Sequence, residues 1–429
     1  MDNTQLINYA GAAIFGLAVL HTFSTKHFLH LAHTSKNHAG LWHLLGEVEV
    51  VFGFWALVLV GCIAVLNHQK AAISYLESQN FTEPLFVFVI LTIAGTKPIL
   101  QSVQNLVSRV AAILPVSPAV GAYFLCLSLV PLLGSLITEP AAMTLAALML
   151  RDRFYTRDIS QKLKYATLGV LFVNISIGGV LTPFAAPPVL MVAEKWGWDI
   201  SFMSSVFGWK AAIAVLINAL IVTAVFRKQL MAIKLALVAN VANDAGDQDT
   251  DTPVPFAVVL VHYLFLGTTV LFAHYPAVFM GLFLFFLGFT EAYQRYQDKL
   301  MLREGLLVAF FLAGLVVLGG KQQWWLQPIL AGMDSTVLFF GSMGLTAITD
   351  NAALTYLGSL VSGLSDGAKY ALVAGAVTGG GLTVIANAPN PAGFAILKEC
   401  FDEQAISPLG LIISALIPTA VAASCFLML

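Results

Sequence analysis

The chain has 429 residues, of which 59% are hydrophobic and 10% are charged, and its formal net charge is −2. Soluble proteins carry about 25% charged residues, so this composition excludes a soluble domain. Long apolar stretches recur along the whole sequence and predict an all-α membrane protein with many spans. Its expected surroundings are the lipid bilayer, and no basic tract suggests a nucleic-acid partner.

The first half of the chain, residues 1–240, contains five stretches that are apolar enough to cross a membrane. A polar, acidic segment at 241–254 follows and is predicted to be a cytoplasmic linker. The second half, residues 255–429, contains five more such stretches. The ten predicted crossings are 8–24, 44–66, 84–102, 165–195, 205–226, 255–274, 276–293, 304–320, 370–397 and 406–428.

Two longer apolar stretches, 117–150 and 325–365, interrupt this series, one in each half. Each is long enough for two short helices and carries an acid, Glu139 in the first and Asp350 in the second. We predict that each stretch forms a re-entrant hairpin whose ends return to the same side of the membrane. Irregular backbone at membrane depth is tolerated only where protein or a cavity covers it.

A Gly/Pro motif follows each of these stretches. The two copies align without a gap, because Gly178 and Gly379, like Thr182 and Thr383, are separated by 201 positions. Glycine permits non-helical backbone and proline removes a hydrogen-bond donor, so the motif predicts two broken helices, 165–195 and 370–397. The alternative is a pair of kinks that serve packing only. The residues expected to unwind the helices are Gly178, Gly179, Pro187, Pro188, Gly379, Gly380 and Pro389.

The distribution of Lys and Arg sets the predicted topology. With the loop 151–164 placed in the cytoplasm, fifteen Lys and Arg lie inside and four outside, as the positive-inside rule expects. Each half then has an odd number of crossings, so the two halves are predicted to be inverted repeats. Both termini are predicted to lie outside the cytoplasm.

Glu139 and Asp350 are the strongest candidates for function. An ionised carboxylate inside an apolar stretch costs several kcal/mol unless it is paired, hydrated or bound to a cation. The sequence pairs Thr138-Glu139 with Thr349-Asp350 as equivalent positions. A structural ion pair, or a neutral acid bonded to backbone, is the alternative for both acids.

Neutral oxygen atoms near these acids and breaks are candidate ligands for a cation such as Na⁺. Broken helices in transporters expose carbonyls that hold ions, and hydroxyl and amide side chains add further oxygens. The candidate residues are Thr138, Asn174, Ser176, Thr182, Thr349, Asn351, Thr383, Asn387 and Asn390.

Other ionisable side chains allow more than one interpretation. Lys97 is either a counter-charge that a bound ion displaces or a residue that extends to the membrane surface. His27, His30 and His33 follow one another at helical spacing, in the predicted first cytoplasmic loop. They suit an interfacial helix, a pH sensor or a metal site.

These motifs resemble those of the ion transporter superfamily, and most closely those of the NhaD-like and putative Na⁺/H⁺ antiporter families. The resemblance rests on the acid-bearing hairpins, the Asp350-Asn351 pair and the two Gly-Gly/Pro breaks, and it spans most of the chain. It implies a homodimeric, elevator-type carrier with a scaffold domain and a transport domain. The first copy departs from the pattern, with Glu139-Pro140 in place of Asp-Asn.

The function we expect is exchange of Na⁺ or Li⁺ for H⁺ across a membrane, in which cation and proton compete for the carboxylates. Na⁺ and H⁺ are then transported ions, and no cofactor and no enzymatic activity are expected. A Na⁺-coupled carrier of a carboxylate or oxyanion, arsenite efflux included, is the main alternative. A His-liganded membrane metalloenzyme is a remote one. The expected location is the bacterial inner membrane.

Overall fold

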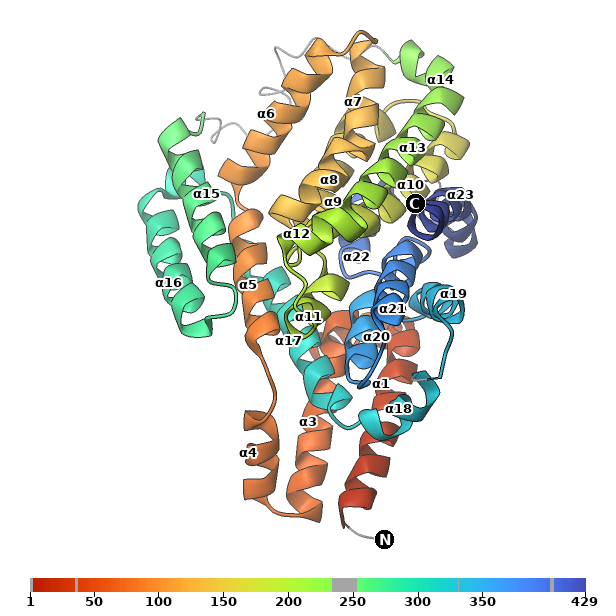
Figure 1. Cartoon of the computed structure of the whole chain (residues 1–429). Coiled ribbons are helices and arrows are strands. Elements are labelled where there is room, and N and C mark those ends of the chain that lie inside the picture. Colours follow the sequence, from red (N-terminus) through yellow and green to blue (C-terminus); the bar gives the residue numbers. More distant parts are fainter. Residues whose placement is uncertain (1–2, 35–37, 234–252, 331, 402–404) are drawn as a thin grey trace.

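The computed structural model describes residues 3–34, 38–233, 253–330, 332–401 and 405–429, and every regular element within these ranges is helical (Figure 1). Most of the predicted linker, from 241 to 252, falls outside the described residues. The all-α prediction is therefore confirmed for the part of the chain that is described.

Six of the described segments are long and apolar enough to cross a membrane, or up to eight if two bent helix pairs are each one span. This count agrees with a multi-pass membrane protein. The predicted crossings 255–274 and 276–293 correspond to the shorter apolar helices α15 (Phe256–Leu271) and α16 (Pro276–Ala292), which are not among these six. The six segments belong to α1 (Asn3–Thr34), α3 (Val48–Leu66), α10 (Gln161–Gly178), α13 (Trp209–Val225), α17 (Leu302–Gly319) and α23 (Pro408–Met428).

The predicted crossing 84–102 coincides with a bent helix pair. The structure has two helices there, α5 (Thr82–Ala94) and α6 (Lys97–Ile113), which meet at 62°. Pro98 explains the bend, because it has no N–H to donate to the carbonyl of Ala94 and so interrupts the helical ladder. The apolar part of α1, Gln5–Thr25, agrees with the predicted crossing 8–24, and the helix itself continues to Thr34.

Each acid-bearing stretch is divided into short helices. In the first, α7 (Pro118–Leu127) and α8 (Leu129–Ile137) lead to a tip at Thr138, after which α9 (Glu139–Leu150) packs against α8. In the second, α19 (Ser335–Thr346) and α20 (Asn351–Ser359) flank a tip at 347–350. Both acids therefore lie where a short helix begins.

The helices after the two tips are interrupted at the Gly/Pro motifs. α10 ends at Gly178, a short 3₁₀ turn follows, and α11 (Pro187–Trp196) resumes after non-helical backbone. α21 (Asp366–Gly379) and α22 (Asn390–Leu397) are separated in the same way. Proline near the start of a helix is favoured because its missing donor has no helical partner there.

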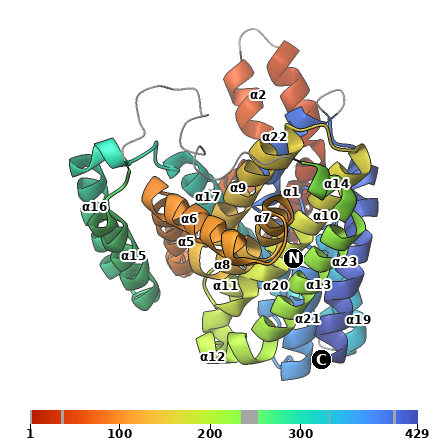
Figure 2. The same ribbon diagram turned by 90° about the horizontal axis from the view of Figure 1, so that it is seen from above.

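Helices of the first half pack against helices of the second half at the centre of the molecule. α11 of the first half packs on α20 of the second, α22 packs on α9, and α10 packs on α21. In the view from above, α15 and α16 lie to one side of these elements, against α5 (Figure 2). Both tips and both breaks thus belong to one packed unit.

Candidate functional site

Glu139 is the first residue of α9, and its side chain is completely buried. Its Oε2 accepts a hydrogen bond of 2.9 Å from Nδ2 of Asn387 in the second half. Its other oxygen, Oε1, is buried and has no hydrogen-bond partner among the described residues. A buried carboxylate therefore presents one free oxygen at the centre of the protein.

Asp350 is held differently. It caps the N-terminus of α20, where one carboxylate oxygen accepts hydrogen bonds from the N–H groups of Ala352 (2.8 Å) and Ala353 (3.2 Å). Its side chain is only partly buried. Asp350 and Glu139 are close enough for their charges to interact, and Glu49 of α3 also acts electrostatically on Asp350. The sequence did not single out Glu49 as part of the site.

The same backbone hydrogen bond occurs at both tips. The N–H of Glu139 donates to the carbonyl of Ala185 (3.5 Å), and the N–H of Asn351 donates to the carbonyl of Ala386 (3.1 Å). The two acceptors differ by 201 positions, the spacing of the Gly/Pro motifs, but the two donors differ by 212.

A second pair of hydrogen bonds has the same spacing. The Thr182 hydroxyl donates to the carbonyl of Ser135 (2.6 Å), and the Thr383 hydroxyl donates to the carbonyl of Ala347 (2.9 Å). Here too the threonines differ by 201 positions, and the residues whose carbonyls accept differ by 212. The two acid-bearing stretches therefore correspond with an offset of 212.

This offset corrects the sequence alignment of the two tips by one residue. Glu139 occupies the position of Asn351, the first residue of the helix, and Thr138 occupies the position of Asp350, the N-cap. The two acids are consequently not equivalent. Thr138 also has a left-handed backbone with φ 75°, a costly conformation for a β-branched residue that is typical of functional sites.

Glycine allows the two broken helices and the tips to approach closely. A Cβ at Gly380 would overlap the Ser176 hydroxyl, which itself donates to the carbonyl of Val377 (2.7 Å). A Cβ at Gly179 would overlap the carboxylate of Glu139. The glycines of the motif are thus needed where the unwound segments touch the other half and the tip.

Side chains bind several of the carbonyls that the breaks release. The Ser135 hydroxyl donates to the Gly178 carbonyl (2.7 Å) and accepts from the N–H of Leu181 (3.0 Å). In the second half Nδ2 of Asn390 donates to the carbonyls of Gly380 (2.7 Å) and Thr383 (2.8 Å). Sequence reasoning missed Ser135, because only the fold brings it to the break.

Unpartnered polar atoms concentrate around the tips. An unsatisfied buried polar group costs about 1–3 kcal/mol, so such a concentration indicates a place for a ligand or for water. Within the described residues, the buried atoms here without a hydrogen-bond partner are Thr138 Oγ1, Glu139 Oε1, Thr346 Oγ1, Asn351 Oδ1 and Nδ2, Asn387 Oδ1, and Asn390 Oδ1.

Asn174 lies in a different network. Its Nδ2 donates to the carbonyls of Leu127 (2.8 Å) and Val215 (3.1 Å), and its Oδ1 accepts from Nδ2 of Asn218 (2.9 Å). The Leu127 carbonyl has lost its helical donor because position 131 is a proline. Asn174 therefore supplies the hydrogen bond that the Leu127 carbonyl lacks at the bend between α7 and α8, and the oxygen of Asn174 already accepts from Asn218.

The remaining candidates lie at known places in the fold. The Thr349 hydroxyl donates to the carbonyl of Leu345 (2.9 Å).

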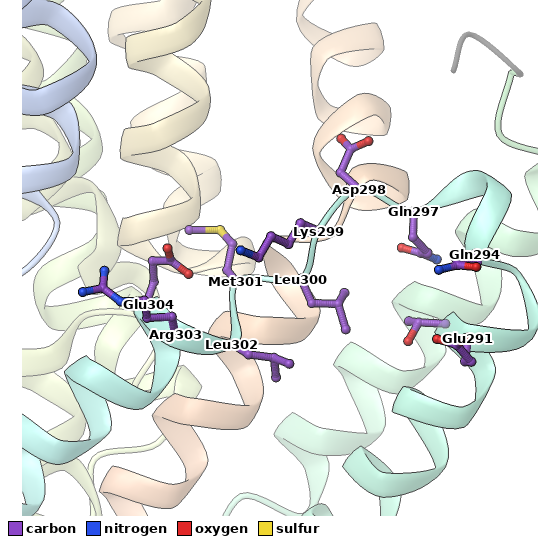
Figure 3. A pocket seen from close by; sticks show the side chains of 11 residues that line it. Glu291, Gln294, Gln297, Asp298, Lys299, Leu300, Met301, Leu302, Arg303 and Glu304 are labelled. Atoms are coloured by element: carbon purple, nitrogen blue, oxygen red, sulfur yellow. The ribbon is translucent and has the colours of Figure 1, made fainter. Parts of the chain in front are cut away.

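Lys97 begins α6 and pairs with Asp298 (3.5 Å). Asp298 belongs to the connection between α16 and α17, and this connection lines a cavity of about 520 Å³ (Figure 3). His27 and His30 lie on the exposed last turns of α1, beyond its apolar span Gln5–Thr25, and His33 belongs to the same helix. Over the described ranges, no three His, Cys, Asp or Glu are placed to hold a metal ion.

Comparison with known proteins adds one finding to this geometry. The model of a protein family described as "Putative Na+/H+ antiporter" matches residues 6–429, which is nearly the whole chain. A search of curated proteins finds no match.

Proposed function

The chain belongs to the putative Na⁺/H⁺ antiporter family, and from this premise we propose that it exchanges Na⁺ or Li⁺ for H⁺ at Glu139 and Asp350. Membership of this family supports a membrane transporter of the cation/proton class. The ions, the residues and the mechanism are the steps that this proposal adds.

The free oxygen of Glu139 is the observation that carries the proposal. An ionised carboxylate within the membrane costs several kcal/mol unless it is paired, hydrated or bound to a cation, so a proton or a cation would stabilise this buried group. Asn351 and Asn387 place further unpartnered amide oxygens in the same region. Proton and cation then compete for one group of oxygens, and this competition alone couples their movements.

The arrangement of the two halves supports the carrier part of the proposal. Each half supplies a tip and a broken helix, and α11 and α22 each pack against a helix of the other half. We infer that the halves are inverted repeats with re-entrant hairpins, that tips and breaks move together as the transport domain, and that two copies form a homodimer. Lys97, and His27, His30 and His33, are left without an assigned part in the exchange.

A carrier of carboxylates or oxyanions is the second candidate, because amide side chains can also bind anions. The unpaired Nδ2 of Asn351 favours it. The buried carboxylate of Glu139 disfavours it, since an anion beside that group would be repelled unless a cation bound with it.

Proton flux in proteoliposomes tests the proposal, with Na⁺, Li⁺, K⁺ and a dicarboxylate supplied in turn. We expect Na⁺ or Li⁺ to drive flux in the wild type, and Glu139→Gln and Asp350→Asn to abolish it. Glu77→Gln, which removes an exposed acid from α4 (Gln69–Glu77), is the matched control and should keep full flux. Flux driven by the dicarboxylate alone, or full Na⁺-driven flux in Glu139→Gln, would refute the proposal.

A further inference from the structure

We propose that Asn387 determines cation affinity by turning its side-chain amide between two positions, one that donates to Glu139 and one that offers its oxygen to the transported cation. This inference rests on the proposed function and assigns a specificity-determining residue within the same site.

Of the two polar atoms of the Asn387 amide, one makes a hydrogen bond and the other has no partner among the described residues. Its side chain is completely buried in the non-helical backbone between α21 and α22. Nδ2 donates to Oε2 of Glu139 at 2.9 Å, whereas Oδ1 is buried and no described residue donates to it. Each of the two hydrogen-bonded groups therefore keeps one buried oxygen without a described donor, and oxygens of this kind are the ligands that an alkali cation requires.

The structure therefore shows the donating position. A carboxylate without a cation is stabilised by an N–H donor, and Asn387 supplies one. An alkali cation requires oxygen atoms instead, and an N–H group pointing at it is repulsive. A half-turn about the terminal torsion of Asn387 exchanges the two ends, and this torsion is broad and roughly two-fold. Because Oδ1 has no described donor to lose, the turn breaks only the bond to Glu139.

The first half has no equivalent of this residue. The position that corresponds to Asn387 is Ala186, 201 residues earlier, which is buried and apolar. The position that corresponds to Asn390 is Val189. The unpartnered amide oxygens around the tips therefore come from the second half, and Asn387 bonds to the acid of the first, so the two halves contribute unequal parts of one cation site.

Two substitutions of Asn387 distinguish a role as cation ligand from a role in packing. Asn387→Ala removes the oxygen and the donor together, whereas Asn387→Asp keeps an oxygen and loses the donor. We expect Asn387→Ala to raise the apparent KM for Na⁺ at least ten-fold, with kcat within about three-fold of the wild type. We expect Asn387→Asp, whose added charge also attracts a cation, not to raise the KM by more than about three-fold. Asn218→Ala, which changes a buried amide that bonds to Asn174, should leave the KM unchanged.

Two measurements on the purified full-length protein decide the matter: Na⁺-driven proton flux in proteoliposomes, and the rise in Tm caused by Na⁺ in detergent. A KM within two-fold of the wild type in Asn387→Ala overturns the inference. So does an equal loss in both variants, which would indicate a structural role. If Asn387→Ala does not fold, a ten-fold loss of Na⁺ affinity in Asn387→Asp overturns it instead. Absence of cation-driven flux in the wild type refutes the proposed function, while the Na⁺-dependent Tm still tests Asn387.

Discussion

Gly178→Ala should separate the first tip from its broken helix. Gly178 has φ −72° and ψ −21°, which any residue adopts, so its backbone does not require glycine. The constraint is contact: a Cβ here would lie 2.6 Å from the carbonyl oxygen and 2.7 Å from the carbonyl carbon of Pro131. Both atoms belong to backbone and cannot rotate away.

The size of the effect follows from that contact. An ordinary carbon–oxygen contact begins near 3.3 Å, so α8 and α10 must move apart by about 0.7 Å. Overpacking of this kind costs about 1–3 kcal/mol. The same shift stretches the bond of 2.7 Å from Ser135 to the Gly178 carbonyl, which is worth about 1 kcal/mol. The better helix propensity of alanine returns about 1 kcal/mol, so the net loss is about 1–3 kcal/mol.

Thermal unfolding of the purified protein in detergent measures this loss, and Na⁺-driven flux reports its effect on the site. Gly267→Ala in α15 is the matched control, because no atom lies within 4 Å of its Cβ position. The control should keep or raise the Tm, whereas Gly178→Ala should lower it and reduce flux. If the two variants are equally stable, the close approach of α8 and α10 does not explain the glycine.

Three further substitutions test the hydrogen bonds around the site. Ser135→Ala should lower the stability by about 1–3 kcal/mol, because it leaves the Gly178 carbonyl and the Leu181 N–H unsatisfied, and Ser135→Thr should lose less in the same unfolding assay. Asn174→Ala should lower the Tm further than Asn80→Ala, an exposed amide, because the Leu127 carbonyl then loses its donor; an equal effect would contradict the assigned network. Asp334 caps α19, and the backbone and side-chain hydrogen bonds of Thr336 hold the pKa of Asp334 below its ordinary value of 3.8. The stabilisation of the protein by ionised Asp334 is present above pH 3.8 and is lost as the pH falls through the lowered pKa. The Tm difference between wild type and Asp334→Ala should therefore disappear in acid. A difference that persists there would contradict this role.

The local features of the site were readable from the sequence. Gly178 and Gly379 lie where the structure ends α10 and α21, because glycine and proline act on their own stretch of backbone. Glu139 and Asp350 stood out because charge is rare in apolar stretches, and both lie at the start of a short helix. The bend between α5 and α6 was also within reach, since Pro98 is visible in the sequence.

The partners of these residues were not readable. Glu139 aligns most naturally with Asp350 in the sequence, since both are acids. The backbone hydrogen bonds instead give Glu139 the position that Asn351 has in the second half. Asn387, which lies 248 positions from Glu139, was one of several candidate ligands, and nothing in the chain indicated that it bonds to that carboxylate. Ser135 carried no signal of its own, because a serine in an apolar helix has many ordinary uses.

The sequence by itself therefore determined the class of protein, the places where the helices break and the two acids that lie near them. These depend on composition and on short-range backbone chemistry, which adjacent residues set. Only the tertiary structure decided the register of the two halves, the hydroxyl and amide groups that bind the released carbonyls, and the oxygens left free around Glu139. Those depend on which surfaces pack together across some two hundred residues of chain, and many sequences with the same hydropathy pattern would pack them differently.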